Sequence, residues 1–330
     1  FALRPEGCVL MGLAEKILQG DIRAAARLMR DVDDGFSSAL DELKILYPYT
    51  GKAYLIGITG PPGAGKSTLT DQITAVFRRQ GKRVGIVAVD PTSPFTGGAI
   101  LGDRIRMNRH ADDAGVFIRS LATRGALGGI SRSTGEVVNI MDAMGMDVVI
   151  IETVGVGQDE IDIVRMAHTT AVVMVPGMGD DIQAIKAGIL EIADVFVVNK
   201  ADRDGADRTA RDLAVMLEMG SRLEGEWLPR VMKTEASRGV GIDELVAEFE
   251  NHHNHLFTSG VIEKFTAEKN AAVFTDMLKE RLFRQLYDAL VADGSFGRIV
   301  AGMATRQIDP YSAVEDILAA SLVYHPAVPR

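Results

Sequence analysis

The chain has 330 residues, of which 47% are apolar and 25% are charged, and this composition excludes a wholly disordered protein. Its formal net charge of −9 argues against nucleic acid or an anionic membrane as a partner, because bulk electrostatics would repel both. The single cysteine, Cys8, excludes an internal disulfide and a cysteine-based zinc cluster. No apolar run is long enough to span a bilayer and the first residues do not resemble a signal peptide, so we expect a cytoplasmic protein.

Residues 1–51 are predicted to form an N-terminal helical segment. Apolar residues recur at steps of three and four over residues 10–17 and 22–29, and again over residues 40–46. Pro48 and Gly51 then end the pattern.

Residues 52–250 are predicted to form a doubly wound α/β domain with a mostly parallel sheet. Short apolar runs rich in valine and isoleucine alternate there with amphipathic helical stretches. The runs mostly lack the alternation of half-buried strands, which is typical of strands buried on both faces of a parallel sheet. The predicted strands lie in AYLIGITG, RVGIVAVD, GVFIRS, DVVIIET, TAVVMVPG, ADVFVVNKAD and WLPRVMKTEA.

Residues 251–330 are predicted to be helical. Residues 265–290 carry an apolar stripe, Asp293-Gly294 and Gly297 are expected to break the helix, and a short helix is expected after Asp309-Pro310. Because this segment has no obvious core of its own, we expect it to form a dimerisation arm.

The strongest functional signal is GPPGAGKST at residues 60–68, which fits the pattern G-x-x-x-x-G-K-[ST] between a strand and a helix. In such a loop, backbone N–H groups and the helix N-terminus bind phosphates. Lys66 is predicted to bridge the β- and γ-phosphates and Ser67 to offer its hydroxyl to Mg²⁺. The predicted nucleotide-binding residues here are Gly60, Pro61, Pro62, Gly63, Ala64, Gly65, Lys66, Ser67 and Thr68.

A second motif, Asn199-Lys200-Ala201-Asp202, follows a predicted strand and indicates guanine as the base. A carboxylate accepts hydrogen bonds from both N1–H and the N2 amine of guanine, and adenine lacks that pair of donors. Asp202, treated as a buried carboxylate, is therefore predicted to select guanine. Asn199 is expected to hydrogen-bond near the loop and the base, and the Lys200 stem to pack across the base.

The segment Thr234-Glu235-Ala236 follows the next predicted strand, where GTPases place a backbone contact to the guanine O6. An ordinary strand-to-helix turn is the alternative for this segment.

Three carboxylates are candidates for the Mg²⁺ and hydrolysis site. Asp90 and Glu152 end predicted strands, and Asp103 lies in a glycine-rich stretch between them. Glu152 begins Glu152-Thr-Val-Gly155, at the position where GTPases usually carry Asp-x-x-Gly, whose glycine N–H contacts the γ-phosphate. The next residue is Val156, where Ras-like proteins have the glutamine that orients the attacking water, so we expect slow hydrolysis without a partner.

With these motifs the chain resembles the MeaB/ArgK-type P-loop GTPases, the methylmalonyl-CoA mutase-associated GTPases that include the human methylmalonic aciduria type A protein. GPPGAGKST, VDPTSPFTGGAILGDRIRM, IIETVGVGQDEIDI and GMGDDIQAIKAGILEIADVFVVNKAD carry the resemblance. It implies GTP or GDP with Mg²⁺ as ligands, and metal-site roles for Ser67, Asp90, Asp103 and Glu152. The departures are Pro94-Phe95 and Glu235.

The resemblance also implies a homodimer that gates the loading and protection of adenosylcobalamin in an acyl-CoA mutase, most simply methylmalonyl-CoA mutase. Catalysis would involve Lys66, Asp103, Glu152, Gly155 and Lys186, and residues 180–186, including Asp180 and Asp181, would form a switch segment that responds to the mutase.

Two other functions are the alternatives. An ATP-dependent kinase linked to basic amino-acid transport is disfavoured by Asp202. A nickel-insertion GTPase would need a cysteine- and histidine-rich metal site, and the candidates here are His252, His253 and His255, which are expected to be solvated without a carboxylate partner.

Overall fold

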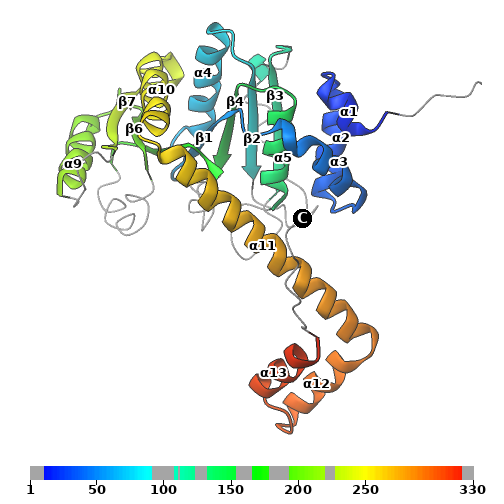
Figure 1. Ribbon diagram of the computed structural model, residues 1–330. Helices are drawn as coiled ribbons and strands as arrows, with labels where there is room; N and C mark the ends of the chain where they lie inside the picture. Colours follow the sequence, from blue (N-terminus) through cyan, green and yellow to red (C-terminus); the bar gives the residue numbers. More distant parts are fainter. Residues whose placement is uncertain are drawn as a thin grey trace, which may run out of the picture. The chain divides into compact units, whose positions relative to one another are not determined.

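The computed structural model of the protein describes residues 11–90, 108–110, 112–122, 132–153, 166–177, 193–219 and 227–321. The chain divides into two compact units, residues 1–260 and residues 261–330 (Figure 1). Among the described helices, none combines the length and the apolarity that crossing a bilayer requires.

The described part of the first unit contains a seven-stranded sheet in the order β3-β2-β4-β1-β5-β6-β7 (Figure 1). All of its paired strands are parallel, which confirms the predicted doubly wound α/β fold, and each predicted apolar run overlaps one strand. The strands are β1 (Tyr54–Thr59), β2 (Val84–Asp90), β3 (Val116–Ala122), β4 (Val148–Thr153), β5 (Thr169–Met174), β6 (Val195–Asn199) and β7 (Arg230–Thr234).

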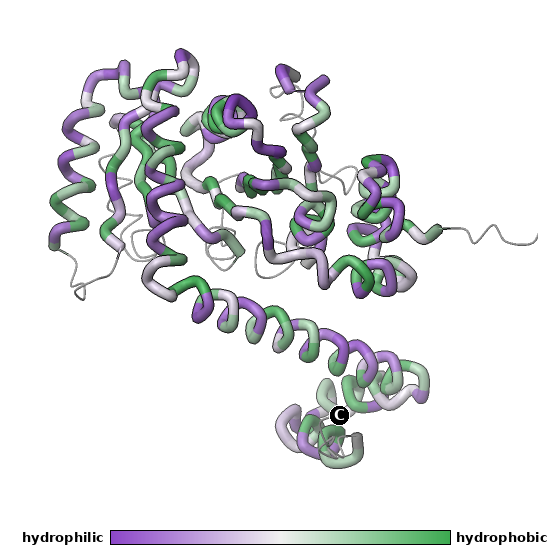
Figure 2. Tube along the Cα trace, turned by 45° about the horizontal axis from the view of Figure 1, so that its top comes forward, coloured by the Kyte–Doolittle hydropathy of each residue, from purple (hydrophilic) through white to green (hydrophobic). Residues whose placement is uncertain are grey.

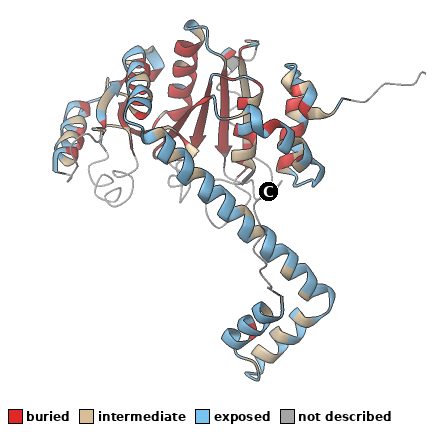
Figure 3. Cartoon of the chain, viewed as in Figure 1, coloured by how far each residue is buried: buried red, intermediate tan, exposed pale blue. Residues whose placement is uncertain are grey.

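Helices cover both faces of this sheet. On one face, α4 (Lys66–Arg79) and α10 (Ile242–Thr258) pack on residues such as Ile56 and Ile58. On the other, α5 (Arg132–Ala143) and α9 (Ala206–Met219) pack on the alternate strand residues. Strands β1, β4 and β5 are consequently buried along their whole length (Figure 3), which explains why their sequences are continuously apolar.

The N-terminal helices form a further layer outside α5. They are α1 (Leu13–Leu18), α2 (Ile22–Asp33) and α3 (Ser38–Leu46), followed by the 3₁₀ turn η1 (Tyr47–Tyr49). Leu28 and Met29 of α2 share a hydrophobic cluster with α5. The buried Asp142 carboxylate of α5 accepts backbone N–H groups of residues 51, 52 and 53, and this ties α5 to the connection between η1 and β1.

The second unit consists of α11 (Val261–Ala292), α12 (Ser295–Ala304) and α13 (Pro310–Ser321). Gly294, with φ of 74°, separates α11 from α12, as predicted, but Gly297 lies inside α12 and does not break a helix. Within α11, every residue of which is described, no residue is buried. Hydrophobic and hydrophilic residues intermix along it (Figure 2), and the exposed large apolar residues of the unit include Phe274, Leu278, Leu282, Phe283 and Tyr311.

Candidate nucleotide-binding site

The phosphate loop connects β1 to the first residue of α4, at the carboxyl edge of the sheet. Three of its glycines, Gly60, Gly63 and Gly65, have φ between 75° and 137°, which L side chains rarely adopt. A Cβ at Gly60 would lie 2.2 Å from the Val173 oxygen, and one at Gly65 would lie 2.5 Å from Asn199 Nδ2. The tight loop therefore requires glycine there, and it leads directly into a helix N-terminus whose first N–H groups lack intrahelical partners.

The Lys66 side chain folds back over this loop. Its Nζ donates hydrogen bonds to the main-chain oxygens of Gly60, at 2.7 Å, and Pro61, at 3.0 Å, and the residue is only 6% exposed. A positive charge is thus held beside the loop N–H groups, where it can balance the charge of a bound triphosphate.

Ser67 and Glu152 are brought together, as the predicted Mg²⁺ site requires. The Ser67 hydroxyl donates to Glu152 Oε1 at 2.6 Å, and the Thr70 hydroxyl donates to Oε2 at 3.0 Å. Glu152 is buried as the penultimate residue of β4, in register with Ile58 of β1. A hydroxyl and a carboxylate are hard oxygen donors, and Mg²⁺ usually keeps several waters, so this pair fits the ion.

Asn199 links the two predicted nucleotide-binding motifs. Its Nδ2 donates to the main-chain oxygen of Ala64 at 2.8 Å, and its Oδ1 accepts the Thr234 hydroxyl and the Ala236 N–H, both at 3.1 Å. The amide is 2% exposed, so these bonds replace those it would make with water. The phosphate loop, β6 and the turn after β7 are therefore held in one arrangement.

Lys200 also contacts the phosphate loop. It has φ of 57°, which is unusual for a residue other than glycine, and its Nζ donates to the Gly63 oxygen at 2.7 Å. At this left-handed residue the chain turns away from the sheet edge. The Ala201 N–H that follows donates to the Thr234 main-chain oxygen.

A cavity of about 240 Å³ lies beside these residues and is lined by members of both predicted nucleotide-binding motifs. Asp202 lines it and is exposed, not buried, because it stands in the turn beyond the end of β6. A base would have to cover its carboxylate on binding. Sequence reasoning did not select Arg203 and Ser237, which follow predicted site residues directly. The lining residues are Gly65, Thr68, Asn199, Lys200, Asp202, Arg203, Ala236 and Ser237.

The turn after β7 is held by its own contacts. Glu235 forms an ion pair with Arg238 at 2.9 Å and exchanges main-chain hydrogen bonds with Val240, around the 3₁₀ turn η3 (Ala236–Arg238). The Ala236 N–H, the predicted kind of donor to guanine O6, donates to Asn199 in this structure. The guanine contact of this segment stays a prediction.

Several predicted residues lie outside the described part of the chain. These are Asp103, Gly155, Val156, Asp180, Asp181 and Lys186. The backbone of Asp90 ends β2, one strand away from Glu152, and its side chain is not described.

Replacing Asn199 by alanine should destabilise the protein by at least about 2 kcal/mol, because buried groups on three segments lose their partner together. GDP affinity should also fall, since the phosphate loop loses a support. Chemical unfolding and GDP titration measure the two effects. Asn254→Ala, which removes an exposed asparagine of α10, should change stability by no more than about 0.5 kcal/mol. Equal effects of both substitutions would contradict the role of Asn199 in holding the phosphate loop, β6 and the turn after β7 together.

The prediction of solvated histidines without a carboxylate partner is wrong for His252. Its side chain is buried, with Nδ1 2.8 Å from the Thr169 hydroxyl and Nε2 3.4 Å from Asp194 Oδ1. Burial lowers the pKa of His252 to about 4, so it is neutral at neutral pH. Among the described residues, no group of three or more histidine, cysteine, aspartate or glutamate side chains could hold a metal ion.

Comparison with known proteins agrees with this geometry. Residues 26–290 match the family of the methylmalonyl-CoA mutase-associated GTPase MeaB. The chain belongs to this family. A relative from Pyrococcus abyssi that carries a GTPase name is 46% identical over 312 residues, which cover 93% of this chain and 95% of that protein. GTPase ArgK of Escherichia coli is 34% identical over 278 residues, which cover 83% and 84%.

The MeaB-family fold is also seen in a solved structure. A crystal structure of a LAO/AO transport system kinase matches with a TM-score of 0.71 at 26% identity, covering 96% of this chain and 99% of the other. The predicted membership of the MeaB/ArgK-type P-loop GTPases is thus confirmed, and with it the GTPase activity.

Proposed function

We propose that this MeaB-family GTPase binds GTP with Mg²⁺ in the cytoplasm and gates the loading and protection of adenosylcobalamin in an acyl-CoA mutase, most simply methylmalonyl-CoA mutase. The family's association with methylmalonyl-CoA mutase supports the choice of partner. The observation that carries the nucleotide part is the joining of Gly60–Thr68 to the Asn199–Asp202 motif through Asn199.

Hydrolysis requires water to attack the γ-phosphorus while the bond to the β–γ bridging oxygen breaks, so that GDP leaves with the electron pair. Lys66 would bind the β- and γ-phosphates and compensate the charge that develops there. Asp202 would accept hydrogen bonds from the guanine N1–H and N2 amine. Ser67 and Glu152 would hold Mg²⁺, with Asp90 and Asp103 as further candidates, and the ion when bound would neutralise phosphate charge.

Slow turnover without a partner follows from the residue after Gly155. The Val156 side chain cannot hydrogen-bond a water, whereas a glutamine side chain orients the attacking water in Ras-like proteins. A mutase would therefore have to complete the catalytic arrangement, and the charged segment with Asp180, Asp181 and Lys186 is the proposed point at which it acts.

The second unit is proposed to form a homodimer. Large apolar side chains such as Phe274, Phe283 and Tyr311 are 66%, 69% and 80% exposed, which is costly in water unless another surface covers them. A second copy of the chain supplies a matching apolar surface by symmetry.

Addition of the mutase should accelerate GTP hydrolysis at least about tenfold over a basal rate below about 1 s⁻¹, because the partner supplies missing transition-state contacts. The measurement is phosphate release at saturating GTP, with and without methylmalonyl-CoA mutase. Light scattering of the protein before mixing should give twice the 35.5 kDa of one chain.

A panel of mutases provides the control. Stimulation by an isobutyryl-CoA mutase alone would identify that enzyme as the partner. If no acyl-CoA mutase bound the protein or stimulated hydrolysis, the proposal would be contradicted. The solved transport system kinase raises phosphotransfer from ATP as a second candidate. Transfer of phosphate from ATP to a protein or a basic amino acid, with little GTP hydrolysis, would favour that function instead.

A further inference from the structure

The carboxylate of Glu152 is held by two hydroxyl groups of the helix that follows the phosphate loop. Ser67 and Thr70 stand three residues apart in α4, so their side chains lie on one face of this helix. The Ser67 hydroxyl donates to Oε1 at 2.6 Å, and the Thr70 hydroxyl donates to Oε2 at 3.0 Å. Each hydroxyl holds a different oxygen, and together they restrict rotation of the carboxylate, whose terminal torsion is otherwise soft.

This contact is closed off from water. Ser67, Thr70 and Glu152 are all buried, and Glu152 belongs to β4, which is buried along its whole length. A carboxylate that has left water depends on hydrogen-bond donors of the protein, and bonds to a charged acceptor are roughly twice as strong as bonds between neutral groups. The bond from Thr70 therefore has a large effect on where Glu152 Oε2 lies.

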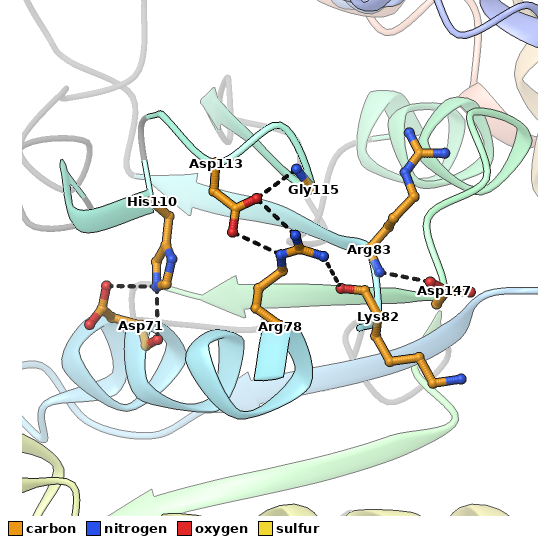
Figure 4. A network of polar contacts seen from close by, with 8 residues as sticks. All are labelled: Asp71, Arg78, Lys82, Arg83, His110, Asp113, Gly115 and Asp147. Atoms are coloured by element: carbon orange, nitrogen blue, oxygen red, sulfur yellow. Dashed lines mark hydrogen bonds and ion pairs between the residues drawn. The ribbon is translucent and has the colours of Figure 1, made fainter. Parts of the chain in front are cut away.

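Other polar residues of α4 make different contacts. Thr74, one turn beyond Thr70 and equally buried, donates its hydroxyl within the helix to the Thr70 main-chain oxygen at 2.7 Å, a common bond for a helical threonine. The main-chain oxygen of Asp71 lies 3.1 Å from Nε2 of His110, in the 3₁₀ turn η2 (Asn108–His110) (Figure 4). The Thr70 hydroxyl, by contrast, leaves its own helix and donates to the carboxylate of the predicted Mg²⁺ site.

The Ser67 hydroxyl can bind Glu152 and a metal ion together. Its hydrogen goes to Oε1, and its oxygen lone pairs stay available to a cation. This combination requires that Oε1 stays within reach of Ser67. We propose that Thr70 is a positioning residue of the Mg²⁺ site, which holds Oε2 and thereby keeps Oε1 directed at Ser67. This inference rests on the proposed Mg²⁺ roles of Ser67 and Glu152.

Thr70→Val removes the hydroxyl and keeps the shape of the side chain. It should weaken metal binding about tenfold or more, the effect expected when a group that orients a metal ligand is lost. The measurement is electron paramagnetic resonance of Mn²⁺, used in place of Mg²⁺, titrated into the protein with a non-hydrolysable GTP analogue. GDP affinity in EDTA should change less than about twofold, since the lost bond joins α4 to Glu152 and not to the nucleotide. Thr70→Ser, which restores the hydroxyl, should recover most of the Mn²⁺ affinity.

Thr74 provides a matched control in the same helix. Thr74→Val removes an equally buried threonine hydroxyl, but the bond that it breaks is internal to α4. This variant should keep the Mn²⁺ affinity of the parent, even if its melting temperature falls as far as that of Thr70→Val. If Thr70→Val does not fold, Thr70→Ala removes the same hydroxyl and takes its place in the comparison.

Glu152→Gln separates this inference from the proposed metal site, and it should weaken Mn²⁺ binding more than Thr70→Val does. Loss of Mn²⁺ binding in Glu152→Gln, together with parent affinity in a folded Thr70→Val protein, would overturn the positioning role of Thr70 alone. An equal loss in Thr74→Val would make the effect one of general packing and would also overturn that role. Unchanged Mn²⁺ affinity in Glu152→Gln would remove Glu152 from the metal site, and the inference with it.

Discussion

Lys66→Ala should lower GTP hydrolysis by about a thousandfold, the size of effect expected when a major charge-stabilising group is removed from a transition state. The ammonium is held over the loop by the Gly60 and Pro61 oxygens. GTP binding should weaken more than GDP binding, because the charge acts on both the β- and γ-phosphates. Single-turnover phosphate release and fluorescence titration with both nucleotides measure these effects.

A lysine three residues beyond the C-terminal end of α4 provides the control. Lys82 is exposed, and its side chain points away from the ion pair of Arg78 and Asp113 (Figure 4), so Lys82→Ala should hydrolyse GTP at the parent rate. Because Lys66 is buried, the melting temperature of the variant must be measured as well. Hydrolysis that survives in a folded Lys66→Ala protein would show that the reaction occurs elsewhere or in a contaminant.

Asp202→Asn should change which base the protein accepts. The parent should bind GTP at least about a hundredfold more tightly than ATP, since a donor or acceptor left without its partner costs a few kcal/mol. In the variant an amide replaces the carboxylate, so GTP should weaken by a similar factor. Xanthosine triphosphate should bind better, because its additional carbonyl accepts a hydrogen bond from the amide. Competition titrations with the three nucleotides test this reversal.

The exposed position of Asp202 sharpens this test. Its carboxylate has no hydrogen-bond or ion-pair partner among the residues that the structure describes, so the substitution disturbs the base contact without breaking an internal one. Asp204→Asn, two residues further and also exposed, makes the same charge change outside the cavity lining and should leave the preference for GTP intact. Equal affinity of the parent for ATP and GTP would contradict the guanine assignment and favour the kinase alternative.

Much of the fold could be predicted because the relevant signals are local. The apolar runs predicted seven strands, and each run overlaps a strand of the parallel sheet, although the two edge strands β3 and β7 are only partly buried. The glycine at 294 predicted a helix break, since a left-handed residue ends a helix. The predicted helix break at Gly297 was wrong because glycine only weakens a helix. Packing of the Phe296 ring on the Tyr287 ring, with centroids 5.1 Å apart, supports α12 around it.

The motifs of the site could be found from sequence because their spacing is set by backbone chemistry. The order strand, glycine-rich loop and helix requires no knowledge of distant contacts. A strand that ends at Asn199 places the following Lys200, Ala201 and Asp202 at the carboxyl edge. The contact between Ser67 and Glu152 also follows from topology, because β1 and β4 are neighbours in the sheet.

What only the tertiary structure decided depends on contacts between residues far apart in the chain. Nothing local distinguishes His252 from His253 and His255, yet the register of α10 on the sheet buries His252 against Thr169. In the sequence, Asp71 is likewise one more polar residue of an amphipathic helix. Only the fold brings the ring of His110, 39 residues later, to the Asp71 main-chain oxygen. Short segments of sequence determine the backbone conformation of strands, loops and helix ends. The hydrogen-bond partner of a polar side chain depends on the tertiary structure, because burial removes that side chain from water.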